Sequence, residues 1–307
     1  MPSSTQRIAV AGAGSLGVHV IRALVAASYP VTVLTRSSQP KSLDLPSDAD
    51  VKYATVDYTS VSSLTKALHN HLGVVSTITS TATGEQNPLI EAAANAGVQR
   101  FLPAEFGSNM ANPKTRALPV FGYKAATEDK LIETAKANPS FTYTMVRNGA
   151  FLDWGLEYDF LLKMKEHSIT IFDQGEQPFS TTTLATVAKA VVGVFEHLKE
   201  TKNRAVYVQD TVITQNVLLQ MAKKASGTED WKVERVTSED WYQKAMAALG
   251  NSPSGEEVGK IMVDLLYPSI YTEGYGGDFS GKNDNELLGI KEMSREEVEK
   301  VVADAFA

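Results

Sequence analysis

Short apolar runs alternate with helical patterns along the first half of the chain. Each run spans four to six residues and is rich in β-branched side chains, whereas the segments between the runs place apolar residues at helical spacing. The predicted strands are 8–11, 31–34, 51–56, 74–78, a run from 98, and 141–146; the predicted helices are 18–27, 60–72, 87–96 and one from 122. Such alternation is typical of an α/β fold with a doubly wound parallel sheet.

The first strand leads directly into a glycine-rich turn. Residues 12–17 read Gly-Ala-Gly-Ser-Leu-Gly, a G-x-G-x-x-G spacing between a strand and a helix that is followed by a second strand. In this context Gly12 makes the tight turn, Gly14 lets the backbone approach a pyrophosphate, and Gly17 lets the helix pack on the sheet. N–H groups at the helix N-terminus, including those of Ser15 and Leu16, would bind the phosphates. The motif predicts a Rossmann-type dinucleotide-binding unit, because a turn that merely packs leaves its spacing and context unexplained.

The end of the second strand indicates which dinucleotide is bound. A NAD-binding unit usually carries an Asp or Glu here, which accepts a hydrogen bond from the ribose 2′-hydroxyl. This chain instead has Arg36 followed by Ser37. A guanidinium can pair with a 2′-phosphate, so we expect NADP(H) as the cofactor. The alternative is a solvated arginine at a strand end.

Polar residues also occur at the ends of later strands. Asp57 follows the third strand, where its carboxylate could accept from the adenine amine or cap a turn. Thr77, in the fourth strand, is expected beside the cofactor ribose, with a solvated loop after the strand as the alternative. Residues 108–122 contain Asn, Pro and Gly and predict a mobile loop over the site.

The regular alternation ends after Phe151. Residues 153–171 form an aromatic-rich stretch that predicts a helix, and its side chains could line a substrate pocket or belong to an ordinary core. We expect substrate contacts from Phe151, Trp154 and Tyr158. The chain from 214 onward is predicted to be mostly helical.

A helix at 183–197 and a strand at 204–208 are predicted to return to the sheet after this stretch. The predicted units are a dinucleotide-binding domain, 1–152 with 180–209, and a smaller, mostly helical substrate-binding region, 153–179 with 210–307.

Composition excludes several classes of protein and site. The 307 residues are 43% hydrophobic and 21% charged, as in ordinary globular proteins, and the net charge of −7 without a basic block argues against a nucleic-acid partner. The absence of cysteine excludes disulfides, thiol catalysis and thiolate metal sites, and it is usual in a reducing compartment. The N-terminus lacks an apolar signal-peptide core, and residues 8–27 are too interrupted by polar residues and glycines for a membrane span. We expect a cytoplasmic protein that acts on a small molecule, either as a monomer or as a homodimer.

Three well-known arrangements for catalysis or metal binding are missing. No tyrosine has a lysine four residues later, as the usual short-chain dehydrogenases require; Tyr123 is followed at that spacing by Thr127. No G-x-S-x-G nucleophile motif is present. His69 and His71 lie in a polar turn without an acidic partner, which predicts a solvated pair and no metal site.

Three motifs together resemble a known family. They are the segment 101–107, which reads Phe-Leu-Pro-Ala-Glu-Phe-Gly, Lys124 at the start of a helix, and 148–151, which reads Asn-Gly-Ala-Phe. They resemble the isoflavone reductase-like group of the NmrA-like family, which includes pinoresinol–lariciresinol, phenylcoumaran benzylic ether and eugenol-forming reductases. The resemblance covers nearly the whole chain and is clearest over 8–155.

The resemblance implies an atypical short-chain dehydrogenase that works without the tyrosine motif. It implies that Arg36 holds the NADPH 2′-phosphate, that Lys124 is the catalytic acid or base and contacts the cofactor, and that Asn148 lies at the cofactor. Two residues depart from the family pattern: Ala104 replaces a usual serine, and Glu128 stands where plant members often have a basic residue.

Spacing alone offers another interpretation of Lys124. Lys124 and Glu128 are four residues apart, which is typical of an ion pair on an exposed helix face. If Glu128 is the neighbour of a catalytic Lys124, it stabilises the ammonium, raises its pKa and favours a general acid over a base.

Two functions follow, from different classes of protein. The first is an NADPH-dependent reductase of a small, aromatic or conjugated substrate, with Lys124 exchanging a proton with a substrate oxygen. The second is a non-catalytic NADP(H)-binding redox sensor, which would need neither Lys124 nor the aromatic residues between Phe151 and Phe160.

Overall fold

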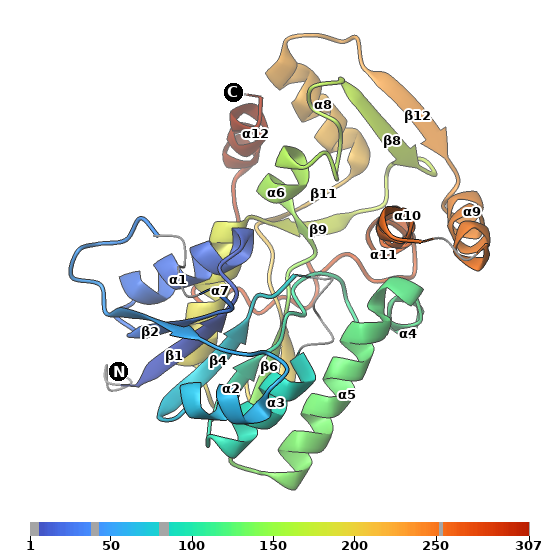
Figure 1. The fold of residues 1–307 in the computed structure, drawn as a ribbon. Coiled ribbons are helices and arrows are strands. Elements are labelled where there is room, and N and C mark those ends of the chain that lie inside the picture. The colour runs from blue at the N-terminus through green and yellow to red at the C-terminus, as the bar shows by residue number, and fades with distance from the viewer. Residues whose placement is uncertain (1–5, 38–42, 80–85, 252–253, 307) are drawn as a thin grey trace.

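A seven-stranded parallel sheet forms the centre of the molecule (Figure 1). The computed structural model describes residues 6–37, 43–79, 86–251 and 254–306. Along the sheet the strands are β3 (Val51–Thr55), β2 (Val31–Thr35), β1 (Arg7–Ala11), β4 (His71–Ser76), β5 (Arg100–Leu102), β6 (Thr142–Arg147) and β10 (Arg204–Tyr207). Every neighbouring pair is parallel, so the predicted doubly wound sheet is confirmed. The strand order reverses between β1 and β4, where ligands bind in such sheets.

Helices cover both faces of this sheet because its strands are apolar on both sides. Ile8 and Val10 of β1 pack with α1 (Ser15–Ala26) and α7 (Leu184–Glu196). Ala9 and Ala11 point the other way, as alternation along a strand requires. They belong to the core formed with α2 (Val61–Ala67), α3 (Gln86–Asn95) and α5 (Gly122–Ala137).

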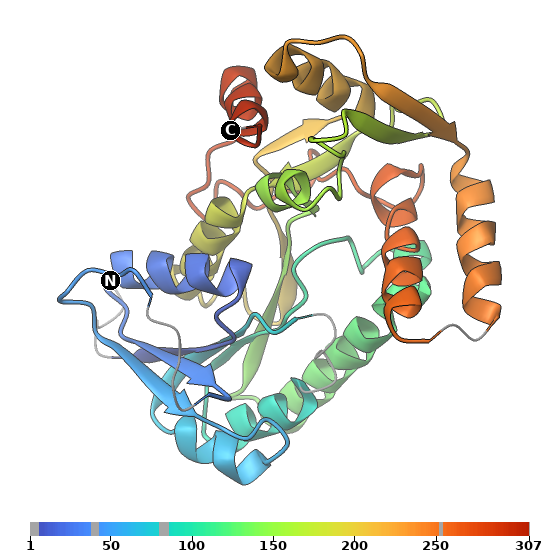
Figure 2. The ribbon, with the colours of Figure 1, turned by 45° about the horizontal axis from the view of Figure 1, so that its top comes forward.

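The chain after β6 builds a second region beyond one end of the sheet (Figures 1 and 2). It contains a three-stranded sheet of order β11-β9-β7 and a parallel pair of β8 and β12. The strands are β7 (Ala150–Phe151), β8 (Ser168–Phe172), β9 (Phe179–Thr182), β11 (Thr211–Ile213) and β12 (Lys232–Val236). The helices are α6 (Leu152–Glu157), α8 (Gln215–Ser226), α9 (Ser238–Gly250), α10 (Glu256–Asp264), α11 (Pro268–Tyr271) and α12 (Arg295–Asp304). The proposed domain boundaries stay a prediction.

The helix predicted over 153–171 in the second region is wrong. Only 152–157 of the aromatic-rich stretch is helical, and β8 ends that stretch with the alternating residues Ser-Ile-Thr-Ile-Phe. The described chain after 214 contains five helices, in agreement with the mostly helical prediction, and also the strand β12, which reads Lys-Val-Glu-Arg-Val. β8 has the two-residue period of a strand, with Ile169 and Ile171 at alternate positions, but the aromatic residues around it masked that period. In β12 the two valines are three positions apart and the other three residues are charged, so its sequence shows no such period.

Residues 108–122, predicted as a mobile loop, are instead folded and packed. They contain α4 (Pro113–Arg116) and a 3₁₀ turn, η2 (Pro119–Phe121), and they bury Met110, Leu118 and Phe121. The polar composition reflects capping: the Asn112 side chain accepts a hydrogen bond from the backbone N–H of Lys114 at the start of α4.

This segment is tied by hydrogen bonds to residues 269–276 of the second region. The hydroxyls of Ser108 and Ser269 lie 2.8 Å apart, and Thr115 Oγ1 donates to the backbone oxygen of Tyr275 at 2.8 Å. Asn112 Nδ2 donates to the backbone oxygen of Gly274 at 2.9 Å. The two regions are therefore docked close to the start of α5. Among the described residues, no helix has the length and apolar character needed to span a membrane.

Candidate active site

The glycine turn lies at the carboxyl end of β1, next to the point where the strand order reverses. Gly12 has φ +99°, in the left-handed region, and a Cβ at Gly17 would lie 2.3 Å from the backbone oxygen of Gly12. Glycine is thus required at both positions by backbone conformation and by close packing. Around Gly14, in contrast, no described atom lies within 4 Å of a Cβ position. The turn is closed at Gly12 and Gly17 and open at Gly14, as the motif predicts for pyrophosphate binding.

Helix α1 presents its N-terminus at this opening. Gly14 is its N-cap, and no side-chain hydrogen bond caps the helix. The first-turn N–H groups of Ser15, Leu16 and Gly17 have no carbonyl of their own helix to bind, because an α-helix leaves its first N–H groups without such partners. They are suited to an anion, and nucleotide binding by these residues stays a prediction.

Thr77 supports the glycine turn. Its Oγ1 lies 2.8 Å from the Gly12 oxygen and 3.2 Å from the Ala11 oxygen, and its backbone N–H donates to the Ala11 oxygen at 2.9 Å. The side chain therefore holds the turn against β4. Its contact with a cofactor ribose stays a prediction.

Arg36 and Ser37 follow β2, the strand beside β1. The Arg36 side chain is exposed and forms no hydrogen bond or ion pair with any residue the structure describes. The backbone N–H of Ser37 donates to Thr35 Oγ1 at 3.1 Å, which fixes the turn after the strand. An exposed guanidinium here is available to a ligand, and its pairing with a 2′-phosphate stays a prediction.

Asp57 caps a turn, one of the two interpretations left open above. Its Oδ1 accepts hydrogen bonds from the backbone N–H and the hydroxyl of Thr59, at 2.9 and 2.7 Å. These two bonds lower the pKa of the Asp57 carboxyl. A contact with adenine stays a prediction.

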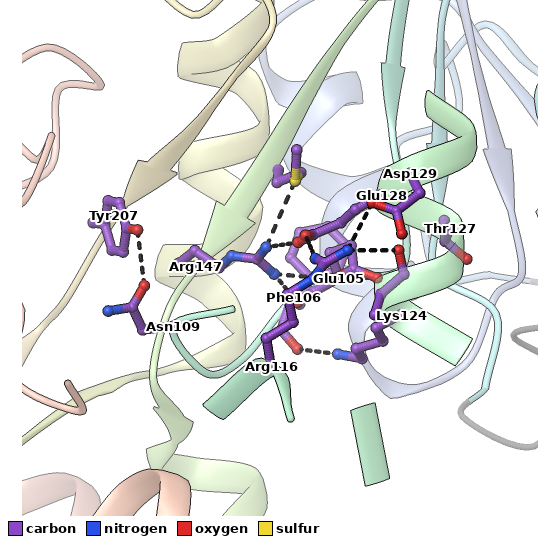
Figure 3. Close-up of polar contacts among 12 residues, drawn as sticks. Glu105, Phe106, Asn109, Arg116, Lys124, Thr127, Glu128, Asp129, Arg147 and Tyr207 are labelled. Carbon is purple, nitrogen blue, oxygen red and sulfur yellow. Dashed lines mark hydrogen bonds and ion pairs between the residues drawn. The ribbon is translucent and has the colours of Figure 1, made fainter. Parts of the chain in front are cut away.

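Lys124 lies in the first turn of α5, with its side chain partly buried (Figure 3). Its Nζ donates to the backbone oxygen of Phe106 at 3.1 Å. Burial lowers the pKa of Lys124, and the positive charge of Arg147 acts in the same direction, whereas the Glu105 carboxylate opposes the shift. A lysine with a lowered pKa can exchange protons closer to neutral pH, as an acid–base catalyst must.

Lys124 and Glu128 do not form the ion pair that their spacing predicts. Glu128 is buried and its two carboxylate oxygens bind two guanidinium groups, those of Arg147 and Arg116. The acidic neighbour that acts on Lys124 is Glu105, and the pKa of Lys124 is lowered overall rather than raised. Spacing of four residues permits an ion pair, but two guanidinium groups compete for this carboxylate more effectively than one ammonium.

Lys124 is part of a charge cluster assembled from several elements (Figure 3). Arg147, at the end of β6, binds Glu105 Oε2 at 2.9 Å and also binds Glu128. Arg116 of α4 binds Glu128 and, at 2.7 Å, Asp129. The members of the charge cluster are Glu105, Arg116, Lys124, Glu128, Asp129 and Arg147. The sequence predicted no role for Glu105 or Arg147, although a charged residue three positions after a buried strand (Glu105) or at the end of one (Arg147) is a signal that could have indicated one.

Asn148 is fully buried beside this cluster. Its backbone N–H and that of Gly149 donate to the Gly107 oxygen at 3.1 and 3.0 Å, while its Oδ1 has no hydrogen-bond partner among the described residues. A Cβ at Gly149 would lie 2.1 Å from the Ser180 oxygen, which explains the glycine. Asn148 thus connects the ends of β5 and β6, and its cofactor contact stays a prediction.

The three residues expected to contact substrate do not form one group. The rings of Trp154 and Tyr158 stack with centroids 5.0 Å apart, and Tyr158 is exposed. Phe151 instead packs against the core that β1 shares with α1 and α7. Substrate contact by these residues stays a prediction.

An aromatic-walled cavity of about 680 Å³ lies between the β8–β12 pair and the helices that follow. Its aromatic lining consists of Phe160, Phe172, Trp241, Tyr267 and Tyr271. None of the three expected substrate residues lines it, although Trp154 lies near Phe160, with centroids 6.2 Å apart. Phe160 belongs to the stretch that the sequence predicted as a possible pocket wall, whereas the other four residues were not predicted because they come from three further segments.

The histidines do not form the solvated pair that the sequence predicted, because His71 is partly buried at the start of β4 and its ring is hydrogen-bonded. His71 Nε2 lies 2.9 Å from Thr32 Oγ1 and its Nδ1 lies 3.1 Å from the His69 oxygen, so both ring nitrogens have protein partners. Among the described residues, no group of three or more His, Asp or Glu side chains is placed to hold a metal ion.

Comparison with known proteins gives matches over nearly the whole chain. The model of the NmrA-like family matches residues 4–251. Oxidoreductase aprR of Aspergillus flavus is 31% identical over 298 residues, covering 96% of this chain and 97% of the relative. Oxidoreductase poxI of Penicillium oxalicum is 30% identical over 299 residues, covering 93% and 90%.

Solved structures agree with the fold. A leucoanthocyanidin reductase–NADPH complex from Vitis vinifera has a TM-score of 0.77 at 19% identity and covers 98% of this chain and 99% of that one. AtPrR2 with NADP⁺ and (+)-pinoresinol has a TM-score of 0.76 at 19% identity, with the same coverage. At this identity the likeness establishes the shared α/β architecture.

Proposed function

The chain belongs to the NmrA-like family and is an oxidoreductase, and we propose that it transfers hydride from NADPH to a small, aromatic or conjugated substrate. Two nearly full-length relatives are named oxidoreductases, and two structures of the same fold contain NADP⁺ or NADPH. When bound, NADPH supplies a hydride from C4 of its nicotinamide. The glycine turn and Arg36 would bind and orient the nucleotide, and Lys124 would supply the proton.

The observation that carries the proposal is the placement of two features at one edge of the sheet. The open glycine turn follows β1, and Lys124 is anchored to Phe106, just after β5. Both strands neighbour β4, and carboxyl ends of parallel strands meet at the same edge. A nucleotide on the turn and a proton donor at Lys124 would therefore share one crevice.

Lys124 balances the charge of the reduction. Hydride addition to a conjugated carbon places negative charge on a substrate oxygen, and the Lys124 ammonium donates a proton to that oxygen. The lysine becomes neutral and recovers its proton from solvent after product leaves. Its lowered pKa supports this role, because an acid catalyst is most effective when its pKa lies close to the pH of the solution.

Nucleotide binding is the first test. Titration of wild type with NADPH and NADH is expected to show a clear preference for NADPH, and Arg36→Ala is expected to reduce that preference by about 10- to 100-fold, the usual contribution of a charged hydrogen bond. Arg235→Ala, an exposed arginine on β12, is the matched control and should retain the preference. Failure of wild type to bind either nucleotide overturns the proposed function.

Turnover is the second part of the test. NADPH oxidation with a panel of aromatic and conjugated carbonyl compounds identifies a substrate, and Lys124→Met at saturating NADPH should lower kcat by about 10²- to 10⁴-fold. Full turnover by that variant contradicts the role of Lys124. Tight NADPH binding without oxidation by any compound favours the redox sensor.

A further inference from the structure

Glu105 occupies an unusual position in the charge cluster. It is fully buried, its Oε2 binds Arg147 at 2.9 Å, and its Oε1 has no hydrogen-bond partner among the described residues. The next residue, Phe106, supplies the backbone oxygen that binds Lys124 Nζ. The same two-residue segment therefore offers Lys124 both a hydrogen-bond acceptor and a negative charge.

The other acids of the charge cluster are already engaged by arginines. Glu128 binds Arg147 and Arg116, and the exposed Asp129 binds Arg116 at 2.7 Å. Glu105 is the carboxylate whose charge opposes the loss of a proton from Lys124.

The charges of the cluster balance in one protonation state. Its three carboxylates are matched by two guanidinium groups and the Lys124 ammonium. Loss of the lysine proton leaves one negative charge in excess in a cluster that contains the buried Glu105 carboxylate with its unsatisfied oxygen. Uncompensated charge is costly where water is excluded, so this arrangement favours the protonated lysine.

We propose that Glu105 is a positioning residue that retains the proton on Lys124, while the neighbouring Phe106 oxygen holds the ammonium in place. Arg147 has the opposite electrostatic effect on the lysine but orients Glu105 through their ion pair. The inference rests on the proposed function for its catalytic meaning, since Lys124 must donate a proton for this retention to matter.

Direct titration of Lys124 tests the inference without requiring turnover. In protein labelled with ¹³C and ¹⁵N at lysine, the side-chain signal is assigned with Lys124→Arg and followed against pH by NMR. Glu105→Gln should weaken the proton affinity of Lys124 by about tenfold or more, since a close opposite charge normally contributes at least that much. Glu128→Gln is the matched control: it also removes a buried carboxylate bound to Arg147 and should change the proton affinity of Lys124 much less.

Two further measurements keep the inference testable if Glu105→Gln does not fold. Glu105→Asp keeps the charge but withdraws it by one methylene, so it should weaken proton binding by Lys124 in the same direction and to a smaller extent. Coupling is reciprocal, so Lys124→Met should raise the pKa of Glu105, followed by its carboxyl ¹³C signal.

The outcomes separate this inference from the proposed function. An unchanged Lys124 titration in Glu105→Gln, or an equal change in Glu128→Gln, overturns the role of Glu105 whether or not a substrate is found. Where a substrate is known, the kcat–pH profile of Glu105→Gln should move to lower pH with the lysine titration, and a uniform loss of kcat at all pH values indicates a merely structural role.

Discussion

At the scale of single residues, Gly14 and Gly17 differ in what surrounds them. A Cβ at Gly17 would clash with backbone, whereas the position at Gly14 faces open space. Gly17→Ala should therefore lower the free energy of unfolding of the nucleotide-free protein by about 1–3 kcal/mol, the usual cost of overpacking, measured by urea denaturation.

Gly14→Ala is the informative partner of that variant. It should leave the free energy of unfolding within about 1 kcal/mol of wild type and should weaken NADPH binding, because the added methyl group occupies the space where the phosphates approach. Wild-type affinity in Gly14→Ala would show that phosphates do not approach the turn at this residue.

Residues of the site were predictable from sequence where the chemistry is local. Gly12, Gly14 and Gly17 were identified because backbone conformation and spacing belong to one short segment. The partner of Lys124 was not, because Glu105 and Arg147 are distant in sequence and only the folded sheet brings them together. Spacing on the helix permits an ion pair between Lys124 and Glu128, but in the folded protein Glu128 binds two arginines instead.

At the scale of elements, the start of β4 gives the molecule a dependence on pH. Burial lowers the pKa of His71 below its ordinary value of 6.5. The unfolded chain then binds a proton more readily than the folded protein as pH falls below 6.5, so acidification destabilises the fold until the folded histidine is also protonated.

The variant His71→Gln should reduce this acid destabilisation. The slope of the free energy of unfolding against pH should differ from that of wild type by at most about 1.4 kcal/mol per pH unit, the limit for one proton. Denaturation between about pH 7 and 5 measures this slope. His69→Gln, at an exposed neighbouring position, is the control that should keep the wild-type slope. Identical slopes in all three proteins would show that His71 is not responsible.

Elements with a strong, uninterrupted period were predictable, and those whose period is masked or absent were not. The strands of the central sheet and helices α1 and α7 were expected from their apolar pattern. The β8–β12 pair, which joins for example Ser168 with Lys232, was not expected, because aromatic residues mask the period of β8 and charged residues leave β12 without one. The capping residues of α4 were interpreted as loop residues, since caps and loops use the same amino acids.

At the scale of the whole molecule, hydrogen bonds near the site contribute to the docking of the two regions. Thr115 is fully buried and its hydroxyl binds the Tyr275 oxygen across the two regions. Thr115→Val keeps the shape of the side chain and leaves that carbonyl without its donor, so the free energy of unfolding should fall by about 1–3 kcal/mol.

Thermal unfolding measures this effect, with Thr134→Val as the control. Thr134 Oγ1 donates to the Lys130 oxygen within α5 itself. That oxygen keeps its place in the backbone hydrogen bonds of the helix when the hydroxyl is removed. A drop in Tm confined to Thr115→Val locates the sensitivity in the docking of the regions. Equal drops in both variants would assign it to the general loss of a hydroxyl.

The chain passes from the central sheet to the second region, back to the sheet and out again, and this order determines how chimeras with relatives can be built. After building α6, β8 and β9, the chain returns to the central sheet with α7, which packs on α1, and with β10, which pairs with β6. A chimera that replaces everything after β6 with a relative's sequence would also exchange an edge strand and a covering helix of the sheet. Grafting a new specificity therefore requires two separate insertions, one before α7 and one after β10, around a retained host segment at 184–207.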